Sequence, residues 1–375
     1  MQKLYDTLEK PKRAFLISIM ENVQSGNEIE RLAESLNLEA AAHEKIRIRE
    51  KNPKFGMGSG KAESLAQKAA EIKADLMIFD MSLSPSQQRN WEEISGLPVI
   101  DRQELIIKIF ADRASTKEAE LQVRLAELTY LLPRLSHKYI DLSRQRGGRY
   151  GTKGAGETKL ETDRRKLEKR IHQLEKEIEN VGKQRQMQRR QRERNKMRVC
   201  AIVGYTNAGK SSLLNALTGA DVQAEDKLFV TLDAVTRRLL IAPDKPVLFT
   251  DTVGFIRSLP HSLVKAFRST LEEAALADII IHILDASDPD IESNYETTMT
   301  VLKELGAMDI PTITLLNKID RLPSAAEPPA SAGEGAVSSV TLDEIQNRFP
   351  GSIAVSVRNK TGLDALKDRI ISMYA

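Results

Sequence analysis

Residues 204–211, Gly204-Tyr-Thr-Asn-Ala-Gly-Lys-Ser211, decide the fold of the second half of this chain. They fit the pattern G-x-x-x-x-G-K-[S/T], and they lie between an apolar run that predicts a strand and a pattern that predicts a helix. Glycines let backbone N–H groups wrap phosphates, and the helix N-terminus adds partial positive charge. In such a loop the lysine reaches the β- and γ-phosphate oxygens and the serine binds Mg²⁺. The expected nucleotide contacts are Gly204, Tyr205, Thr206, Asn207, Ala208, Gly209, Lys210, Ser211 and Ser212.

Apolar runs around this loop predict a mostly parallel sheet with helices on both faces, because such strands are buried on both sides. The runs are 199–203, 247–249, 279–284, 312–316 and 353–355. They place the second half of the chain, 197–375, in the α/β class.

Asp251-Thr-Val-Gly254 follows one of these runs, so a carboxylate lies at the carboxyl edge of the sheet beside the phosphates. We expect Asp251 to hold Mg²⁺ through water and Gly254 to donate its N–H to the γ-phosphate. Thr231 is the candidate that adds its hydroxyl to Mg²⁺ when the γ-phosphate is present, with Thr236 as the alternative. The predicted metal ligands are Ser211, Thr231 and Asp251, and the predicted catalytic residues are Asn207, Lys210, Thr231 and Gly254.

Asn317-Lys-Ile-Asp320 follows the run 312–316 and selects the base. A carboxylate at Asp320 accepts both the N1–H and the 2-amino group of guanine, whereas adenine offers no such pair of donors. Leaving the carboxylate unpaired costs on the order of several kcal/mol, which disfavours ATP. The sequence therefore predicts a P-loop GTPase domain that binds GTP or GDP with Mg²⁺. The expected guanine contacts are Asn317, Lys318, Asp320, Ser356, Val357 and Arg358.

Residues 1–112 alternate short apolar runs with helical patterns, which predicts a small N-terminal α/β domain. The runs are 15–19, 45–48, 76–79 and 98–100, and a helical pattern covers 62–72. The motif Gly56-x-Gly58-x-Gly60-Lys61 resembles a phosphate-binding loop and so suggests a second phosphate site. It lacks the four-residue spacer, and Ala62 stands where Ser or Thr should bind Mg²⁺, so a structural turn is the favoured interpretation and weak nucleotide binding is the alternative.

Two heptad seams predict an antiparallel helical hairpin over 113–196. The first runs from Leu121 to Leu142 with a kink expected at Pro133, and the second from Leu160 to Val181. The glycine-rich stretch 146–156 between them is expected to interrupt the helix. Its tip, 144–157, would carry the predicted RNA contacts Arg144, Arg146, Arg149 and Lys153.

Charge is distributed unevenly along the chain. Residues 144–198 hold 19 Lys or Arg and 8 Asp or Glu, a net charge of +11; since the whole chain carries +3, the remainder carries −8. A basic block between acidic globular parts is expected of a protein that docks on a phosphate backbone, although a solvated helix face would also be basic.

Composition limits where the chain works. No apolar run approaches the roughly 18 residues of a membrane span, and the run 14–20 continues directly into Glu21. The single cysteine, Cys200, lies in an apolar run, so it predicts a core position and a reducing compartment. We expect a cytoplasmic monomer, with loose membrane association as the alternative location.

Several stretches make the chain resemble the HflX family of ribosome-associated GTPases. They are 147–165, 204–212, Leu228-Phe-Val-Thr-Leu-Asp233 and Gly58-Ser-Gly-Lys-Ala-Glu63. The resemblance implies the large ribosomal subunit as partner, with the hairpin tip near the peptidyl transferase centre, and a role in splitting or rescuing stalled ribosomes under stress. Two departures affect loop geometry: Ala155 replaces a usual proline, and Ala234-Val235 replace the usual Pro-Thr.

Hydrolysis requires a group that orients the attacking water, which in many GTPases is a glutamine after the switch II glycine. Here that position is Phe255. Because an apolar ring cannot orient water, we expect slow hydrolysis that the ribosome stimulates. Asn207 resembles the P-loop asparagine of GTPases that use K⁺, so K⁺ near the β- and γ-phosphates is a further candidate ion.

Two other functions fit parts of the sequence. The first is a nucleotide-stabilised RNA-binding or ribosome-assembly module in which the basic hairpin binds and hydrolysis is incidental. The second is a metabolic P-loop kinase, which would need an acceptor pocket and a lid; Asn317 to Asp320 favours guanine specificity instead. The five histidines show no metal-ligand spacing.

Overall fold

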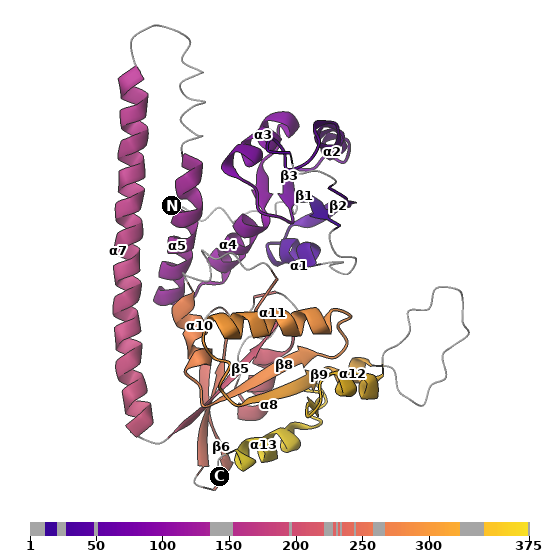
Figure 1. Cartoon of the computed structure of the whole chain (residues 1–375), viewed down its shortest axis with the longest axis vertical. Coiled ribbons are helices and arrows are strands. Elements are labelled where there is room, and N and C mark those ends of the chain that lie inside the picture. The colour runs from indigo at the N-terminus through magenta and orange to yellow at the C-terminus, as the bar shows by residue number, and fades with distance from the viewer. Residues whose placement is uncertain are drawn as a thin grey trace, which may run out of the picture. The chain divides into compact units, whose positions relative to one another are not determined.

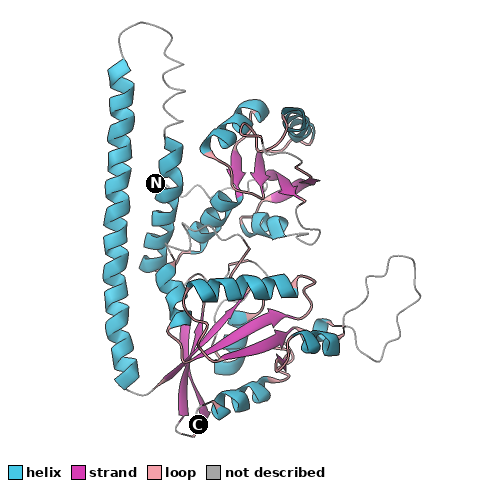
Figure 2. Ribbon diagram, viewed as in Figure 1, coloured by secondary structure: helices cyan, strands magenta, loops and turns pink. Residues whose placement is uncertain are grey.

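A computed structural model describes eleven stretches of the chain (Figures 1 and 2). They are residues 12–20, 28–48, 52–135, 153–194, 197–220, 228–229, 232, 235–243, 245–257, 267–322 and 341–373. The chain divides into two compact units, residues 1–112 with 120–177 and residues 113–119 with 178–375.

The first unit contains a four-stranded parallel sheet in the order β2-β1-β3-β4. Its strands are β1 (Arg13–Ile19), β2 (Glu39–Ile46), β3 (Leu76–Phe79) and β4 (Val99–Asp101). Its helices are α1 (Glu28–Ser35), α2 (Ser59–Glu71), α3 (Pro85–Ser95) and α4 (Arg102–Arg113). The predicted run 45–48 overlaps only the last two residues of β2, because the rest of this edge strand consists of alanines and polar residues and carries little strongly apolar signal.

One face of this sheet packs against α2 and α3 around the fully buried Trp91. Its indole N–H donates to the Phe55 carbonyl at 3.0 Å, and its ring contacts Phe79 with centroids 4.7 Å apart. Gly58, from the glycine-rich motif, caps α2, and Lys61 pairs with Glu44 at 3.5 Å. The motif therefore forms a turn and a helix start.

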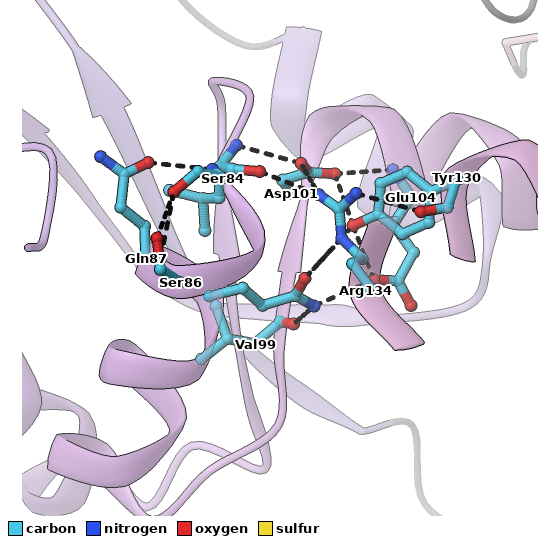
Figure 3. A network of polar contacts seen from close by, with 10 residues as sticks. Ser84, Ser86, Gln87, Val99, Asp101, Glu104, Tyr130 and Arg134 are labelled. Atoms are coloured by element: carbon cyan, nitrogen blue, oxygen red, sulfur yellow. Dashed lines mark hydrogen bonds and ion pairs between the residues drawn. The ribbon is translucent and has the colours of Figure 1, made fainter. Parts of the chain in front are cut away.

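A buried polar network ties the end of the next helix to this sheet (Figure 3). The helix α5 (Lys117–Leu131) passes into the 3₁₀ turn η1 (Leu132–Arg134), so the α-helix stops just before Pro133. Arg134 donates to the Leu83 carbonyl at 2.8 Å and to Gln88 at 2.9 Å, and its Nη2 lies 3.3 Å from Asp101 Oδ2. The Tyr130 hydroxyl reaches the same carboxylate at 3.2 Å.

The helix α7 (Lys153–Arg194) spans 42 residues. It contains Gly154 and Gly156, so the expectation that the glycine-rich stretch stays non-helical to 156 is wrong for its last residues. Each glycine destabilises a helix by about 1 kcal/mol relative to alanine. Once a long helix has formed, each further residue adds a hydrogen bond, so the helix can extend through two glycines near its start. The predicted tip residues Arg144, Arg146 and Arg149 lie outside the described residues.

The second unit contains a six-stranded sheet in the order β10-β9-β8-β5-β7-β6, parallel except for β6, which runs antiparallel to β7. Its strands are β5 (Arg198–Gly204), β6 (Val235–Ala242), β7 (Lys245–Asp251), β8 (Ile279–Asp285), β9 (Thr312–Asn317) and β10 (Ile353–Ala354). Its helices are α8 (Lys210–Thr218), α10 (Arg268–Ala275), α11 (Ile291–Glu304), α12 (Leu342–Arg348) and α13 (Leu363–Ser372), with the 3₁₀ turn η2 (Ile319–Arg321).

Five of these strands overlap the predicted apolar runs, and β6 had no prediction. On one face of the sheet, Leu213 of α8 and Leu366 of α13 pack with Phe249 and Cys200. Burial raises the pKa of the Cys200 thiol to about 12, as expected for an inert core thiol. On the other face, buried residues of α11 and α12 pack against β8 and β9.

The site is positioned by the order of the strands. The chain moves from β5 to β7 on one side and then returns to β8 on the other, so the direction of winding reverses at β5. Ligands of doubly wound sheets bind at the carboxyl edge at such a reversal. None of the helices within the described stretches is long and apolar enough to cross a membrane.

Candidate functional site

The predicted phosphate loop lies at the carboxyl end of β5 and leads into α8. Gly204, Asn207 and Gly209 have φ values of 154°, 61° and 102°, so the backbone departs from ordinary conformations three times within six residues. A side chain at Gly204 would collide with the Ile283 carbonyl. Glycine adopts positive φ at little cost, but at Asn207 this backbone is uncommon, and such residues cluster at ligand sites.

Lys210 is the first residue of α8, and its side chain is buried. Its Nζ donates to the Tyr205 carbonyl at 2.9 Å. Burial lowers the pKa of Lys210 to about 8; Lys318 lowers it further, while Asp251 opposes the shift. Burial disfavours the charged form of Lys210 because it removes the ammonium from water. A phosphate group beside it would favour the charged form again, because the opposite charges attract.

Ser211 and Asp251 meet beside the lysine, as the sequence predicted. Ser211 Oγ donates to Asp251 Oδ2 at 2.6 Å, and Asp251 is fully buried at the end of β7. A hydroxyl and a carboxylate are the hard oxygen donors that Mg²⁺ prefers. The two side chains therefore fit a Mg²⁺ ion, with the rest of its shell left to water and phosphate.

The guanine motif is joined directly to the phosphate loop. Asn317 Nδ2 donates to the Ala208 carbonyl at 2.9 Å, and Asn317 Oδ1 accepts from Val357 N–H at 3.1 Å. Lys318, with φ of 64°, donates to the Asn207 carbonyl at 2.8 Å. Hydrogen bonds thus join three segments that are far apart in the sequence.

Asp320 and Ser356, from the same two segments as Asn317 and Val357, lie together. Ser356 Oγ donates to Asp320 Oδ1 at 2.5 Å and accepts from Asn359 N–H at 3.2 Å. The Ser356 hydrogen bond lowers the pKa of Asp320, and the charges of Arg358 and Arg321 add to this effect. Asp320 is therefore ionised at neutral pH, which is the form that accepts two guanine donors.

The segment after Asp251 folds back on the phosphate loop. Phe255 is buried, and its backbone forms a parallel bridge with Tyr205. Thr206 Oγ1, at the same contact, is buried and has no hydrogen-bond partner among the residues that the structure describes. An unpaired hydroxyl beside the lysine fits an incoming phosphate oxygen.

The other predicted residues, except Ser212, are either outside the described part of the chain or placed away from the phosphate loop and guanine motif. Thr231 lies outside the described residues. Thr236, the alternative switch I residue, lies in β6, where its hydroxyl is 2.9 Å from that of Thr250. The side chain of Lys153, like the other predicted RNA contacts, is also outside what the structure describes. Ser212 is half-buried on α8.

Three residues of the site were missed. Asp285 pairs with Lys318 at 2.7 Å and so orients it. Asp285 directly follows the apolar run 279–284, and the same pattern was used to predict Asp251, so Asp285 could have been predicted from the sequence. Arg257 and Asp290, which pair at 3.0 Å, had no such signal, because neither belongs to a recognisable motif.

Three family models match consecutive parts of the chain. The model described as GTP-binding GTPase N-terminal matches residues 23–111, and the GTP-binding GTPase Middle Region matches 113–192. The model described as 50S ribosome-binding GTPase matches 199–318. Together they cover most of the chain in order.

Curated relatives and solved structures agree with these models. GTPase HflX of Akkermansia muciniphila is 47% identical over 99% of this chain and 86% of its own length. GTPase HflX of Escherichia coli strain K12 is 43% identical over 85% of this chain and 76% of its own length. A crystal structure of SsGBP in complex with GDP is 26% identical, with a TM-score of 0.52 over 96% of this chain and 98% of that one.

Proposed function

Because this chain belongs to the GTPase HflX family, we propose that it is a GTP-driven switch on the large ribosomal subunit that dissociates or rescues stalled ribosomes under stress. The chain is a GTP-hydrolysing enzyme with a P-loop GTPase fold. Its target, its ribosomal contacts and the roles of individual residues are the subject of the proposal.

One observation carries the nucleotide part: Lys318 of the guanine motif donates to the carbonyl of Asn207 in the phosphate loop. This contact would set the spacing between the base and the phosphates, so that one guanine nucleotide would occupy both sites. Lys210 would hold the β- and γ-phosphates and Gly254 N–H the γ-phosphate, while Asp320 reads guanine with support from Ser356. Gly204 to Ser212 would wrap the phosphates, and Asn317, Val357 and Arg358 would frame the base.

Mg²⁺ would be held by Ser211 and, through water, by Asp251, with Thr231 joining when the γ-phosphate is present. Bound there, the ion would offset charge on the β- and γ-phosphate oxygens. Because Thr231 would engage only with GTP, it would couple the nucleotide state to the shape of the neighbouring loop.

Phe255 favours slow hydrolysis by the chain alone, since the position that orients water in many GTPases is an apolar, buried ring. We expect large ribosomal subunits to raise GTP turnover by ordering the switch segments. The measurement is phosphate release with and without large subunits at a fixed GTP concentration. Equal rates would remove the ribosome from the hydrolytic step.

Asn207 is the residue proposed to bind a second ion, K⁺. Its left-handed backbone, with φ of 61°, places it at the turn of the phosphate loop. Its amide oxygen could help hold K⁺ near the β- and γ-phosphates, where a cation offsets developing charge. Turnover should fall when Na⁺ replaces K⁺ at constant ionic strength, and the fall should be smaller in Asn207→Ala.

The ribosomal part draws on charge and family. The family model over 199–318 is described as a 50S ribosome-binding GTPase, and residues 144–198 carry a net charge of +11. In the proposal the chain has a small α/β domain at 1–112, a helical hairpin at 113–196 and the GTPase domain at 197–375. The hairpin tip, with Arg144, Arg146, Arg149 and Lys153, would contact rRNA near the peptidyl transferase centre. The protein would act as a cytoplasmic monomer.

Co-sedimentation tests this part directly. The full chain is layered on sucrose gradients with separated ribosomal subunits and either GDP or a non-hydrolysable GTP analogue. We expect binding to the large subunit with the analogue only, and a steep loss of binding as salt rises, because lysines and arginines would displace counterions from rRNA. Binding to neither subunit would overturn the proposal.

The alternative, an RNA-binding or assembly module with incidental hydrolysis, predicts a different result for Lys210→Ala. A switch would lose its ribosomal activity with its hydrolysis, whereas a passive module would keep RNA binding and function. Subunit dissociation by this variant, measured on intact ribosomes, separates the two.

A further inference from the structure

The short segment Gly254 to Arg257, which we call the switch II strand, is paired with the phosphate loop by its backbone. Phe255 N–H donates to the Gly204 carbonyl at 3.1 Å, and Thr206 N–H donates to the Phe255 carbonyl at 2.8 Å. Phe255 and Ile256 are each 1% exposed. The segment is therefore packed as a structured element and not as a loose loop.

Hydrogen bonds and an ion pair hold Arg257, at the C-terminal end of the switch II strand. The Tyr205 hydroxyl, from the phosphate loop, accepts from Arg257 N–H at 3.0 Å. The Arg257 guanidinium pairs with Asp290 Oδ2 at 3.0 Å, at the N-cap position of α11, and lies 3.5 Å from Asn294 Oδ1. Arg257 and Asp290 are only 22% and 14% exposed, so water screens the pair weakly.

The fastened strand lies against the groups that would receive the γ-phosphate. A Cβ at Gly254 would be 2.9 Å from Lys210 Nζ and 2.8 Å from Thr206 Cγ2. A phosphate bound by both Lys210 Nζ and Gly254 N–H needs a hydrogen bond of about 2.7–3.2 Å on each side. The Lys210 ammonium ends a flexible side chain and can turn aside, but the backbone Cα of Thr206 is also 2.9 Å from the same Cβ position, so Gly254 is packed on the phosphate-loop backbone itself. We infer that this packing loosens when a γ-phosphate enters between Lys210 and Gly254.

We propose that Tyr205, Arg257 and Asp290 form a latch that holds the switch II strand on the phosphate loop and lowers the affinity for GTP relative to GDP. The groups that would hold the β-phosphate belong to the loop itself and to α8, so a diphosphate does not compete with the latch. A triphosphate competes with the latch, because its γ-phosphate would lie between Lys210 and the switch II strand. Opening also frees Thr206, whose unpaired hydroxyl then gains a phosphate partner. The inference rests on the proposed roles of Lys210 and Gly254.

The size of the effect follows from population shift. When only a fraction of molecules has the latch open, the apparent affinity for a triphosphate falls by that fraction, while the affinity for a diphosphate is unchanged. A partly buried ion pair and a hydrogen bond each contribute about 1 kcal/mol, which corresponds to roughly a fivefold change. Removing either contact should therefore raise the affinity for GTP relative to GDP by about 3- to 10-fold.

The experiment compares full-length variants by equilibrium binding of fluorescent GDP and a fluorescent non-hydrolysable GTP analogue, both with Mg²⁺. Arg257→Met and Asp290→Asn break the ion pair from its two ends, and Tyr205→Phe removes the hydroxyl. Each should bind the triphosphate analogue about 3- to 10-fold more tightly relative to GDP. Arg257→Lys keeps a cation within reach of Asp290 and should behave like the unmodified chain.

Glu292→Gln is the matched control. Glu292 also lies in the first turn of α11 and pairs with Arg348 at 3.2 Å, but it does not touch the switch II strand. This variant should leave the affinity ratio unchanged. Hydrogen exchange gives a second readout: the Thr206 and Phe255 amides should exchange faster in Arg257→Met than in the control.

Two results would overturn the latch. Equal changes in the affinities for both nucleotides would mean that the three residues only support the fold. A weaker affinity for the triphosphate analogue would mean that they hold the strand in the GTP-binding conformation. If the unmodified chain bound neither nucleotide, the proposed site roles would fail instead, so the two failures are distinguishable. Thermal unfolding of each variant identifies one that does not fold, and Arg257 and Asp290 test the same contact independently.

Discussion

The buried polar networks of the two units differ in how their charges are satisfied. In the N-terminal unit, Asp101 is fully buried, but it accepts from Leu83 N–H at 3.1 Å, from Glu104 N–H at 2.8 Å, and from the Tyr130 and Arg134 side chains. In the GTPase unit, Lys210 is buried with another cation, Lys318, close enough to lower its pKa.

Perturbed pKa values occur in both networks, so they do not by themselves identify a functional site. Burial raises the pKa of Asp101, and burial with two nearby carboxylates raises that of Tyr130. What separates the GTPase site is strained backbone at Asn207 and Lys318, together with cations gathered at a helix N-terminus. Asp251 and Asp285 offset part of this positive charge, and a bound anion would offset more, whereas the buried carboxylate of the N-terminal network already has four donors.

The largest expected effect is the loss of the Asp101 carboxylate. Asp101→Ala removes the side-chain acceptor of two backbone N–H groups and the carboxylate that pairs with Arg134, while the Tyr130 hydroxyl keeps Glu104 as an acceptor. The N-terminal unit should therefore lose about 3–5 kcal/mol of unfolding free energy. Urea unfolding with circular dichroism measures it. Glu63→Ala, an exposed change on α2, should stay within about 0.5 kcal/mol. A loss under about 1 kcal/mol would mean that the network contributes little.

Lys210→Met should give the opposite pattern. It removes a buried cation but keeps the volume, so the unfolding free energy should stay the same or rise, while GTP turnover falls by about 10²–10³-fold. Steady-state phosphate release and urea unfolding on the same sample check both halves. If stability fell as in Asp101→Ala, the contrast between the two networks would be lost.

His282 supplies a third, intermediate effect. It is fully buried in β8 against Tyr295, and neither ring nitrogen has a hydrogen-bond partner among the described residues. Burial, with a smaller effect of Lys210, lowers its pKa to about 3. Between pH 6.5 and 3 the unfolded chain binds a proton that the folded chain does not, so stability falls as pH drops through this range.

This histidine should therefore account for about 2 kcal/mol of unfolding free energy lost between pH 7 and pH 5. His282→Phe keeps the stacking on Tyr295 and removes the proton, so its stability should depend less on pH by that amount. Urea unfolding at the two pH values gives the comparison. An unchanged dependence on pH would show that His282 titrates normally.

The smallest effect concerns the Tyr130 hydroxyl, which donates to Asp101 at 3.2 Å or Glu104 at 3.1 Å. Tyr130→Phe keeps the aromatic ring beneath the Arg134 guanidinium, whose Cζ lies 3.5 Å from the ring centroid. Asp101 keeps its other hydrogen-bond donors. The N-terminal unit should lose about 1–2 kcal/mol. A loss as large as that of Asp101→Ala would place the hydroxyl, and not the carboxylate, at the centre of the network.

The sequence was most informative where the chemistry is local. Residues 204–211 carry their own glycines, lysine and serine, and the strands β5, β7, β8 and β9 each overlap an apolar run. Prediction missed β6 and placed β2 several residues too late, and both are edge strands with polar or mixed faces. It also failed at the start of α7, where the length of the helix offset the local cost of glycine.

The sequence by itself determined that this chain has a phosphate loop, a carboxylate that can read guanine and a strongly basic segment, because each depends on residues that are neighbours along the chain. Only the tertiary structure decided that Lys318 meets Asn207, that Arg257 meets Asp290 and that Arg134 reaches Asp101. These contacts join residues from 33 to 111 positions apart, so they arise from strand order and helix packing, which no local pattern encodes.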